Sequence, residues 1–170
     1  IGAGWLKEET EIMGGDFPHR WTQTKDAILA MKELWTKDEA EYHGTYYDFP
    51  PVRSFPKPVQ KPHPPVFLGG KAPNAFKRVV EWGDGWMPNH ASVEEIRQGR
   101  ETLNRLAKEA GRDPSTIEVM AFGMSGRYRD REAIKDLEQA GVSRVTIWLG
   151  DTEKPGALRE IEEIARQVLD

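Results

Sequence analysis

Hydrophobic and polar positions follow two different rhythms in the first part of this chain. In residues 22–35, apolar side chains recur every three or four positions, which is the spacing of one face of a helix. Residues 39–49 instead hold two short aromatic runs on either side of His43 and Gly44, a pattern typical of a β-hairpin with a glycine turn. The first part of the chain therefore predicts a helix followed by a hairpin.

Residues 50–65 contain seven prolines. Proline lacks the backbone N–H that a helix interior or a central strand requires, so we expect an extended surface connector. A disordered proline-rich ligand segment is the alternative. The interleaved Val52, Phe55 and Val59 favour a segment that packs against the protein.

From residue 66 onward, short apolar runs alternate with amphipathic stretches. Ser92 is expected to cap the longest helix, whose Glu94 and Glu95 suit its positive end. Strand followed by helix, repeated four times, predicts parallel strands joined by helical crossovers. The expected strands are 66–68, 85–87, 117–122 and 145–149, and the expected helices lie within 72–80, 92–110, 133–137 and 158–168.

The fold class predicted from this alternation is α/β. Two architectures fit it: part of a (β/α)8 barrel, or a small open doubly wound sheet. A complete barrel needs roughly 250 residues, and this chain has 170. The pattern therefore favours about half a barrel, with four to five β/α units.

Composition excludes several classes of site. The chain has no cysteine, which excludes disulfides, zinc–thiolate sites and cysteine nucleophiles. The net charge is −4 and the basic residues are scattered, so no nucleic-acid-binding face is expected. The apolar runs are far shorter than a membrane span, and we expect a cytoplasmic protein. Because the sequence opens at Ile1 without methionine, we interpret it as a fragment; a trimmed start of a complete small domain is the alternative.

The strongest candidate for chemistry lies in VFLGGKAPNAF, residues 66–76, where a strand gives way to a helix. Gly69 and Gly70 allow close approach of the backbone to a ligand, and the first amides of a helix favour an anion. Lys71 adds a cation, and Asn74 can donate a further hydrogen bond. The alternative is a tight turn beside a solvated lysine. The fingerprints of dinucleotide and nucleoside-triphosphate sites are absent from the sequence.

Other candidates carry weaker signals. The four histidines do not have the spacing of metal ligands, so no metal site is expected. His90 follows the second strand and is the histidine best placed to face a barrel mouth, although an exposed loop position is the simpler interpretation. Asp84 is expected to stabilise a turn, and Trp86 to line the core or a pocket. Ser125 lacks the sequence context of a nucleophile elbow.

Several motifs in order carry a family resemblance. GAGWLKEE at the start, YHGTYYDF in the hairpin, PKPVQKPHPPVFLGG and GDGWMP together resemble the C-terminal half of the luciferase-like monooxygenase superfamily. PKPVQ followed by the glycine pair and GDGWMP most resembles its deazaflavin-dependent oxidoreductases, and AGVSRVTIWL is similar to the last barrel strand. The likeness covers nearly the whole chain, residues 1–170, with 39–65 as a hairpin and proline-rich insertion.

This resemblance implies a TIM barrel that binds coenzyme F(420), a deazaflavin, or FMN at the C-terminal ends of its strands. It also implies an oxidoreductase or monooxygenase acting on a small organic substrate. By position, Gly2, Gly4 and Trp5 would lie at the end of the fourth barrel strand beside the cofactor. The turn Gly69, Gly70 and Lys71 would follow the fifth strand and contact the cofactor's phosphate through backbone amides. No catalytic residue is assigned.

The resemblance also implies a difficulty, because the first three strands of the family's barrel have no counterpart in the chain. A half-barrel exposes unpaired strand edges, which another chain usually covers. We therefore expect a homodimer or pairing with another half-barrel, and the isolated chain is expected to be an inactive part of an enzyme if it is complete. Two alternatives stay open: a non-catalytic assembly or binding module, and a barrel of the isomerase or aldolase type that binds a sugar phosphate.

Overall fold

The computed structural model describes residues 1–124, 126–150 and 153–169. The chain divides into two compact units, Ile1–Pro65 and Val66–Asp170. We call them the N-terminal and the C-terminal unit and describe each by itself. Ser125, considered above as a nucleophile, lies outside the described residues.

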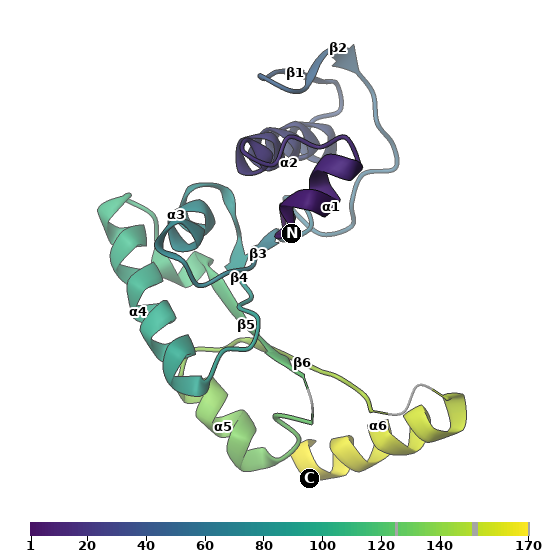
Figure 1. Ribbon diagram of the computed structural model, residues 1–170, viewed down its shortest axis with the longest axis vertical. Helices are drawn as coiled ribbons and strands as arrows, with labels where there is room; N and C mark the ends of the chain where they lie inside the picture. Colours follow the sequence, from purple (N-terminus) through teal and green to yellow (C-terminus); the bar gives the residue numbers. More distant parts are fainter. Residues whose placement is uncertain (125, 151–152, 170) are drawn as a thin grey trace. The chain divides into compact units, whose positions relative to one another are not determined.

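The N-terminal unit consists of two helices and a hairpin (Figure 1). Strands β1 and β2 pair antiparallel, with Tyr42 opposite Phe49. The predicted helix and hairpin are therefore confirmed, although the hairpin strand continues through two prolines at the edge of its two-stranded sheet. The elements of this unit are α1 (Lys7–Ile12), α2 (Arg20–Thr36), β1 (Ala40–His43) and β2 (Asp48–Val52).

Asp26 of α2 fixes the turn of the hairpin. Its carboxylate accepts hydrogen bonds from the hydroxyl of Tyr42 at 2.7 Å and from the amides of Tyr46 and Tyr47 at 2.7 and 3.0 Å. Burial alone raises the pKa of Asp26, but these hydrogen bonds outweigh it and hold the pKa below its usual value. Burial, together with the bond to Asp26, raises the pKa of Tyr42 to about 12. The hairpin is thus tied to α2 by one carboxylate.

The proline-rich connector does not pack in the way its sequence predicts. Val52, Phe55 and Val59 are 37%, 63% and 96% exposed, so the expectation that they anchor the segment is wrong. Lys57 attaches it instead, because its ammonium donates to the carbonyl oxygens of Leu34 and Lys37 at the end of α2. A cation at these carbonyls also complements the negative end of the helix dipole.

The C-terminal unit is an α/β layer with one parallel sheet (Figure 1). Its four strands lie in the order β3-β4-β5-β6, and each neighbouring pair is parallel. The alternation predicted from residue 66 onward is confirmed. The elements are β3 (Phe67–Leu68), α3 (Pro73–Trp82), β4 (Gly85–Trp86), α4 (Val93–Glu109), the 3₁₀ helix η1 (Pro114–Thr116), β5 (Glu118–Gly123), α5 (Arg131–Gln139), β6 (Arg144–Ile147) and α6 (Lys154–Leu169).

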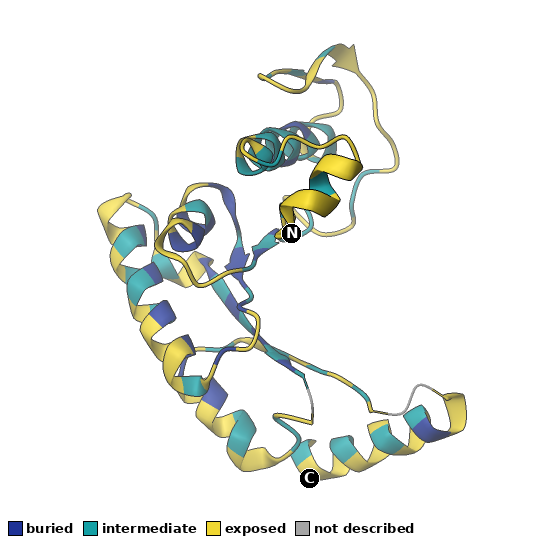
Figure 2. Cartoon of the chain, viewed as in Figure 1, coloured by how far each residue is buried: buried dark blue, intermediate teal, exposed yellow. Residues whose placement is uncertain are grey.

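One face of this sheet is covered by helices. Along β5, buried Val119 and Ala121 alternate with half-buried Met120 and Phe122. Figure 2 shows the matching buried stripe on α4, which consists of Ile96, Gly99, Leu103 and Ala107. The core of the unit lies between the sheet and these helices, and the face with Met120 and Phe122 is the more open one.

Two polar side chains join the strands and helices of this core. The carboxylate of Asp84 accepts the amide of Val66 at 2.7 Å, so Asp84 stabilises the start of β3; the turn role expected for it stays a prediction. Arg112 follows α4, and its Nη1 donates to the carbonyl oxygens of Val79, Val80 and Gly83 at 2.8–3.2 Å. Arg112 thereby binds carbonyl oxygens at the C-terminal end of α3, where intrahelical donors run out.

Candidate functional site

The candidate site lies at the C-terminal ends of the parallel strands of the C-terminal unit. Because all four strands run in the same direction, the segments after β3, β4, β5 and β6 meet at one edge of the sheet. In open and closed α/β sheets this edge is where ligands bind. The turn with Gly69, Gly70 and Lys71 follows β3 at this edge.

The Gly69–Lys71 turn has the backbone geometry that its glycines predict. Gly70 has φ of +94°, a conformation that other residues rarely adopt. A Cβ at position 69 would meet nothing nearer than the carbonyl oxygen of Met87, at 3.6 Å. The turn is therefore open on the side of Gly69 and requires glycine at position 70.

Trp86 of β4 is hydrogen-bonded to this turn. Its indole Nε1 donates a hydrogen bond of 2.7 Å to the carbonyl oxygen of Gly70. The ring is fully buried and packs against Phe76 with the ring centroids 5.1 Å apart. On α4, a Cβ at position 99 would lie 2.2 Å from Trp86 Cη2, so only glycine leaves room for the indole. Trp86 is thus a buried support of the turn, as the sequence predicts for a core tryptophan.

The first turn of α3 offers few amides. Its N-cap is Ala72, which makes no side-chain capping bond, and Pro73 has no N–H to donate. The amide of Ala75 donates to the carbonyl oxygen of Ala72 at 2.8 Å. The amide of Asn74 donates to no backbone carbonyl in the described part of the chain. An anion at this helix would therefore be bound by the amide of Asn74 and by the turn before it.

Lys71 differs from the solvated lysine that the sequence leaves open, because it forms an ion pair. Its Nζ lies 2.7 Å from Oε1 of Glu95, in the first turn of α4. Ser92 caps α4 as predicted, and Glu95 completes a capping box with it: the Glu95 carboxylate accepts the amide of Ser92 at 2.8 Å, and the Glu95 amide donates to Ser92 Oγ. The bond from Lys71, followed by those with Ser92, lowers the pKa of Glu95 to about 2.

Behind this ion pair is a pocket of about 260 Å³ between α3 and α4. Lys71 and Glu95 line it together with the aromatic rings of Phe76 and Trp86. Polar Gln98 and Thr102 of α4 complete its wall beside Gly99.

The segments after β4 and β5 are linked to each other at the same edge. The hydroxyl of Tyr128 donates to the carbonyl oxygen of Ala91 at 3.1 Å. His90, the histidine considered for the barrel mouth, is exposed and has φ of +50°. Among the described residues, none makes a contact with His90 that would assign it a role.

A second pocket at this edge, of about 450 Å³, lies between the segments after β5 and β6 and helix α6. Arg129 pairs with Glu160 and donates to the carbonyl oxygen of Trp148 at 2.7 Å. Glu160 also accepts the amide of Gly150. The Trp148 ring is 51% exposed and stands edge-on to Phe122, so it forms an aromatic wall at the edge of the sheet.

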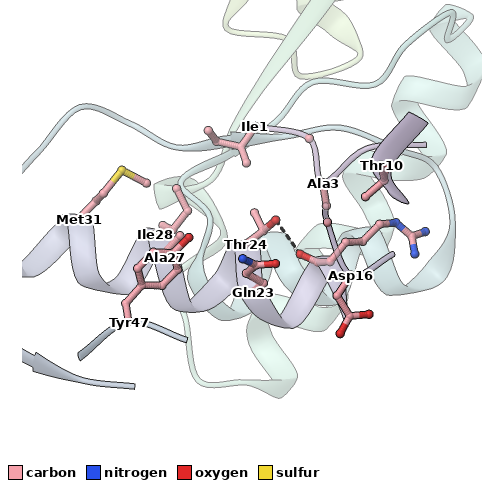
Figure 3. A pocket seen from close by; sticks show the side chains of 13 residues that line it. Ile1, Ala3, Thr10, Asp16, Gln23, Thr24, Ala27, Ile28, Met31 and Tyr47 are labelled. Atoms are coloured by element: carbon pink, nitrogen blue, oxygen red, sulfur yellow. Dashed lines mark hydrogen bonds between the residues drawn. The ribbon is translucent and has the colours of Figure 1, made fainter. Parts of the chain in front are cut away.

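The N-terminal candidates lie in the other unit. Gly2 lines a pocket of about 320 Å³. Figure 3 shows other residues of its lining, among them Ala27 and Ile28 of α2 and Tyr47. The carbonyl oxygen of Gly4 accepts Arg20 Nε at 3.1 Å, and the side chain of Trp5 is 84% exposed. Residues 1–4 form no strand in the structure, so the expected strand end at Gly2 and Gly4 is absent from the described fold. Their role beside a cofactor stays a prediction.

Sequence reasoning missed three features of this site: the ion pair of Lys71 with Glu95, the hydrogen bond of Trp86 to Gly70, and the cluster of Arg129, Trp148 and Glu160. The first two join residues far apart in the sequence. The only signal for them is the topology itself, because parallel neighbouring β/α units bring the start of one helix beside the turn of the unit before it. In the described part of the chain no group of three acidic or histidine side chains is arranged to hold a metal, and no helix is long and apolar enough to cross a membrane.

A family model described as luciferase-like monooxygenase matches residues 1–168. The chain belongs to the luciferase-like monooxygenase family. The resemblance drawn from GAGWLKEE, the glycine pair and GDGWMP is thereby confirmed.

Curated proteins include sequence relatives of this luciferase-like chain. An uncharacterised protein of Mycobacterium tuberculosis is 35% identical over 169 residues, covering 99% of this chain and 58% of that protein. The FMNH(2)-dependent dimethylsulfone monooxygenase of Pseudomonas putida is 34% identical over 114 residues, covering 65% of this chain and 31% of the enzyme. The chain spans less than two thirds of the length of these curated relatives.

A solved structure shares the fold. An F(420)-dependent secondary alcohol dehydrogenase, in complex with an F(420)–acetone adduct, superimposes with a TM-score of 0.74 at 18% identity, covering 100% of this chain and 69% of that chain. At this identity the likeness shows the fold alone: an α/β arrangement with a parallel sheet.

Proposed function

We propose that this protein is an oxidoreductase that uses coenzyme F(420) or FMN to transform a small organic substrate, by hydride transfer or by monooxygenation. The observation that carries the proposal is the family match over residues 1–168. The names of an FMNH(2)-dependent and an F(420)-dependent relative support the two cofactor options. The finer choice of the deazaflavin branch rests on the sequence motifs PKPVQ and GDGWMP.

The Gly69–Lys71 turn is the proposed contact for the cofactor's phosphate. Three observations fit an anion there: the open backbone at Gly69, the amide of Asn74 that donates to no backbone carbonyl, and the ammonium of Lys71. Oriented amides at the start of a helix favour negative charge. The hydrogen bond from Trp86 to the carbonyl oxygen of Gly70 supports a turn with a fixed backbone.

The protein's part in the reaction is to bind and orient. The bound cofactor would supply the redox chemistry, and the protein would hold the cofactor's ring against the substrate. Met120 and Phe122 on the open face of the sheet, and Trp148 at its edge, supply apolar surface that excludes water. Gly2, Gly4 and Trp5 remain proposed cofactor contacts, and no residue is assigned as the proton donor.

We further propose that the chain forms part of a TIM barrel. The sheet order β3-β4-β5-β6 leaves β3 and β6 each with one partner strand in the described part of the chain. Ile161 and Leu158 of α6 are about half exposed, which supports further packing on that helix. Additional β/α units, or a second chain as in a homodimer, would pair with the outer edges of β3 and β6 and cover the exposed apolar residues of α6. The family match favours a flavin-type cofactor over a sugar phosphate, and no observation favours a purely structural module.

The proposal is tested by titrating the full-length protein into F(420) and into FMN while cofactor fluorescence is recorded. We expect saturable quenching or a spectral shift with one of the two. If neither cofactor responds at protein concentrations up to the solubility limit, the proposed function is wrong.

A further inference from the structure

Lys71, the cation of the proposed phosphate site, forms an ion pair with the carboxylate of Glu95. Lys71 and Glu95 are 24 positions apart, yet their side chains meet at 2.7 Å with about half of each side chain buried. The turn after one strand is thereby joined to the first turn of the helix after the next strand.

Two further hydrogen bonds hold Glu95 at the start of α4. Its second oxygen, Oε2, accepts the amide of Ser92 at 2.8 Å, and its backbone amide donates to Ser92 Oγ at 3.2 Å. These two bonds form the capping box of α4 and fix the carboxylate at the start of the helix. The carboxylate is thereby held at the start of α4, beside Lys71.

A fixed carboxylate changes what the turn offers to an anion. Lys71 attracts a phosphate, but Glu95 repels the same phosphate and competes for the same ammonium. The adjacent Glu94 makes no such contact, because its carboxylate bonds to Arg97 and Gln98 of its own helix. Only one of the two neighbouring glutamates is thus placed to influence the turn.

We propose that Glu95 is an affinity-determining residue, which weakens phosphate binding at the Gly69–Lys71 turn by holding Lys71. The proposal rests on the proposed function in one respect, namely that this turn binds a phosphate. A cofactor phosphate held in this way is bound mainly by backbone amides, and its release is favoured because Lys71 regains its carboxylate partner.

The matched variants are Glu95→Gln and Glu94→Gln. Each removes one negative charge from the same helical turn. Glutamine at position 95 can still accept the amide of Ser92, since Glu and Gln both serve in a capping box, so α4 keeps its start. Only the first variant releases Lys71.

The probes are inorganic phosphate, FMN and riboflavin, which lacks the phosphate. We expect Glu95→Gln to bind FMN and inorganic phosphate about two- to fivefold more tightly, the range of an exposed ion pair. Riboflavin affinity is expected to stay unchanged, and Glu94→Gln is expected to match the wild type for all three. Adding Lys71→Met to Glu95→Gln should abolish the gain.

Equal affinities in the two glutamine variants, or weaker FMN and phosphate binding in Glu95→Gln, would overturn the proposal. Phosphate binding is also followed by NMR at the amides of Gly70, Lys71 and Asn74. If these amides respond to phosphate more strongly in Glu95→Gln while no variant binds FMN or F(420), the proposed cofactor function is wrong and the role of Glu95 stands. If they do not respond in any variant, the role of Glu95 is wrong as well.

Discussion

The indole Nε1 of Trp86 donates a hydrogen bond of 2.7 Å to the carbonyl oxygen of Gly70. This bond links the core of the C-terminal unit to its candidate site, because the same buried ring packs on Phe76 and lies against Gly99. The turn after β3 is therefore held by a side chain from β4. Changes at Trp86 or Gly99 are expected to reach the site without touching a ligand.

Trp86→Phe removes the N–H donor and keeps an aromatic ring. We expect faster amide hydrogen exchange at Gly70 and Lys71 and several-fold weaker binding of FMN relative to riboflavin, because the lost bond is worth about 1 kcal/mol. Hydrogen exchange and a fluorescence titration measure the two effects. Trp35→Phe, in the N-terminal unit, is the control and should leave the exchange of the turn unchanged. An unchanged turn in Trp86→Phe would show that the bond does not fix it.

Gly99→Ala is expected to destabilise the protein by about 1–3 kcal/mol, because the added Cβ would meet Trp86 Cη2 at 2.2 Å. The direction of this change in the free energy of unfolding is informative. Alanine in a helix interior is otherwise favoured over glycine by about 1 kcal/mol, so helix propensity alone would stabilise the variant. Urea denaturation gives the free energy of unfolding. Glu101→Ala on the exposed side of α4 is the matched control and should change it by less than about 0.5 kcal/mol. A Gly99→Ala variant as stable as the wild type would contradict the packing described.

Arg112→Met keeps the aliphatic stem and removes the guanidinium that binds the last carbonyls of α3. We expect a loss of about 2 kcal/mol in the free energy of unfolding, the scale of hydrogen bonds to a charged group. Arg112→Lys should recover part of this loss because a cation remains. Arg105→Met serves as the control, since Arg105 pairs only with exposed Glu109 on its own helix. Equal stability of the two methionine variants would argue against the capping role.

The carboxylate of Asp26 makes the stability of the hairpin depend on pH. Its folded-state pKa lies below the ordinary value of 3.8 because the hydrogen bonds from Tyr42 and the turn amides outweigh burial. The stabilisation is therefore fully present above about pH 4 and is lost as the pH falls through the lowered pKa. Asp26→Asn should be less stable than the wild type at pH 7, and the difference should shrink as the pH falls below 4. Thermal melts from pH 7 to pH 3 test this, and a difference that is independent of pH would contradict it.

Local patterns were sufficient to predict most of the fold. The alternation of short apolar runs with amphipathic stretches indicates each strand and each α-helix after residue 66, and Ser92 indicates the start of α4. Helix α1 was not predicted, because it has only six residues, no side-chain cap and no buried face. Such a helix leaves no periodic pattern in the sequence.

The site itself was predicted only in part. Gly69 and Gly70 could be predicted as part of the site because a glycine pair at a strand-to-helix turn indicates a backbone conformation that other residues rarely adopt. Gly70 has such a conformation in the structure. The partner of Lys71 was not detectable, since an ion pair across 24 positions depends on how two neighbouring β/α units lie side by side. The prediction that Val59 packs against the protein was wrong for the same reason. The spacing of apolar residues in a proline-rich segment does not show whether another part of the chain lies close enough to cover them.

The central claim is that the Gly69–Lys71 turn binds the phosphate of a flavin-type cofactor. The most direct measurement compares the dissociation constants of FMN and riboflavin for the full-length protein, with F(420) titrated in parallel. The account predicts saturable binding of FMN or F(420). If FMN binds, its affinity should be at least about tenfold above that of riboflavin, equal to about 1.4 kcal/mol from the phosphate. Equal affinity for FMN and riboflavin, or binding of neither FMN nor F(420), would contradict it.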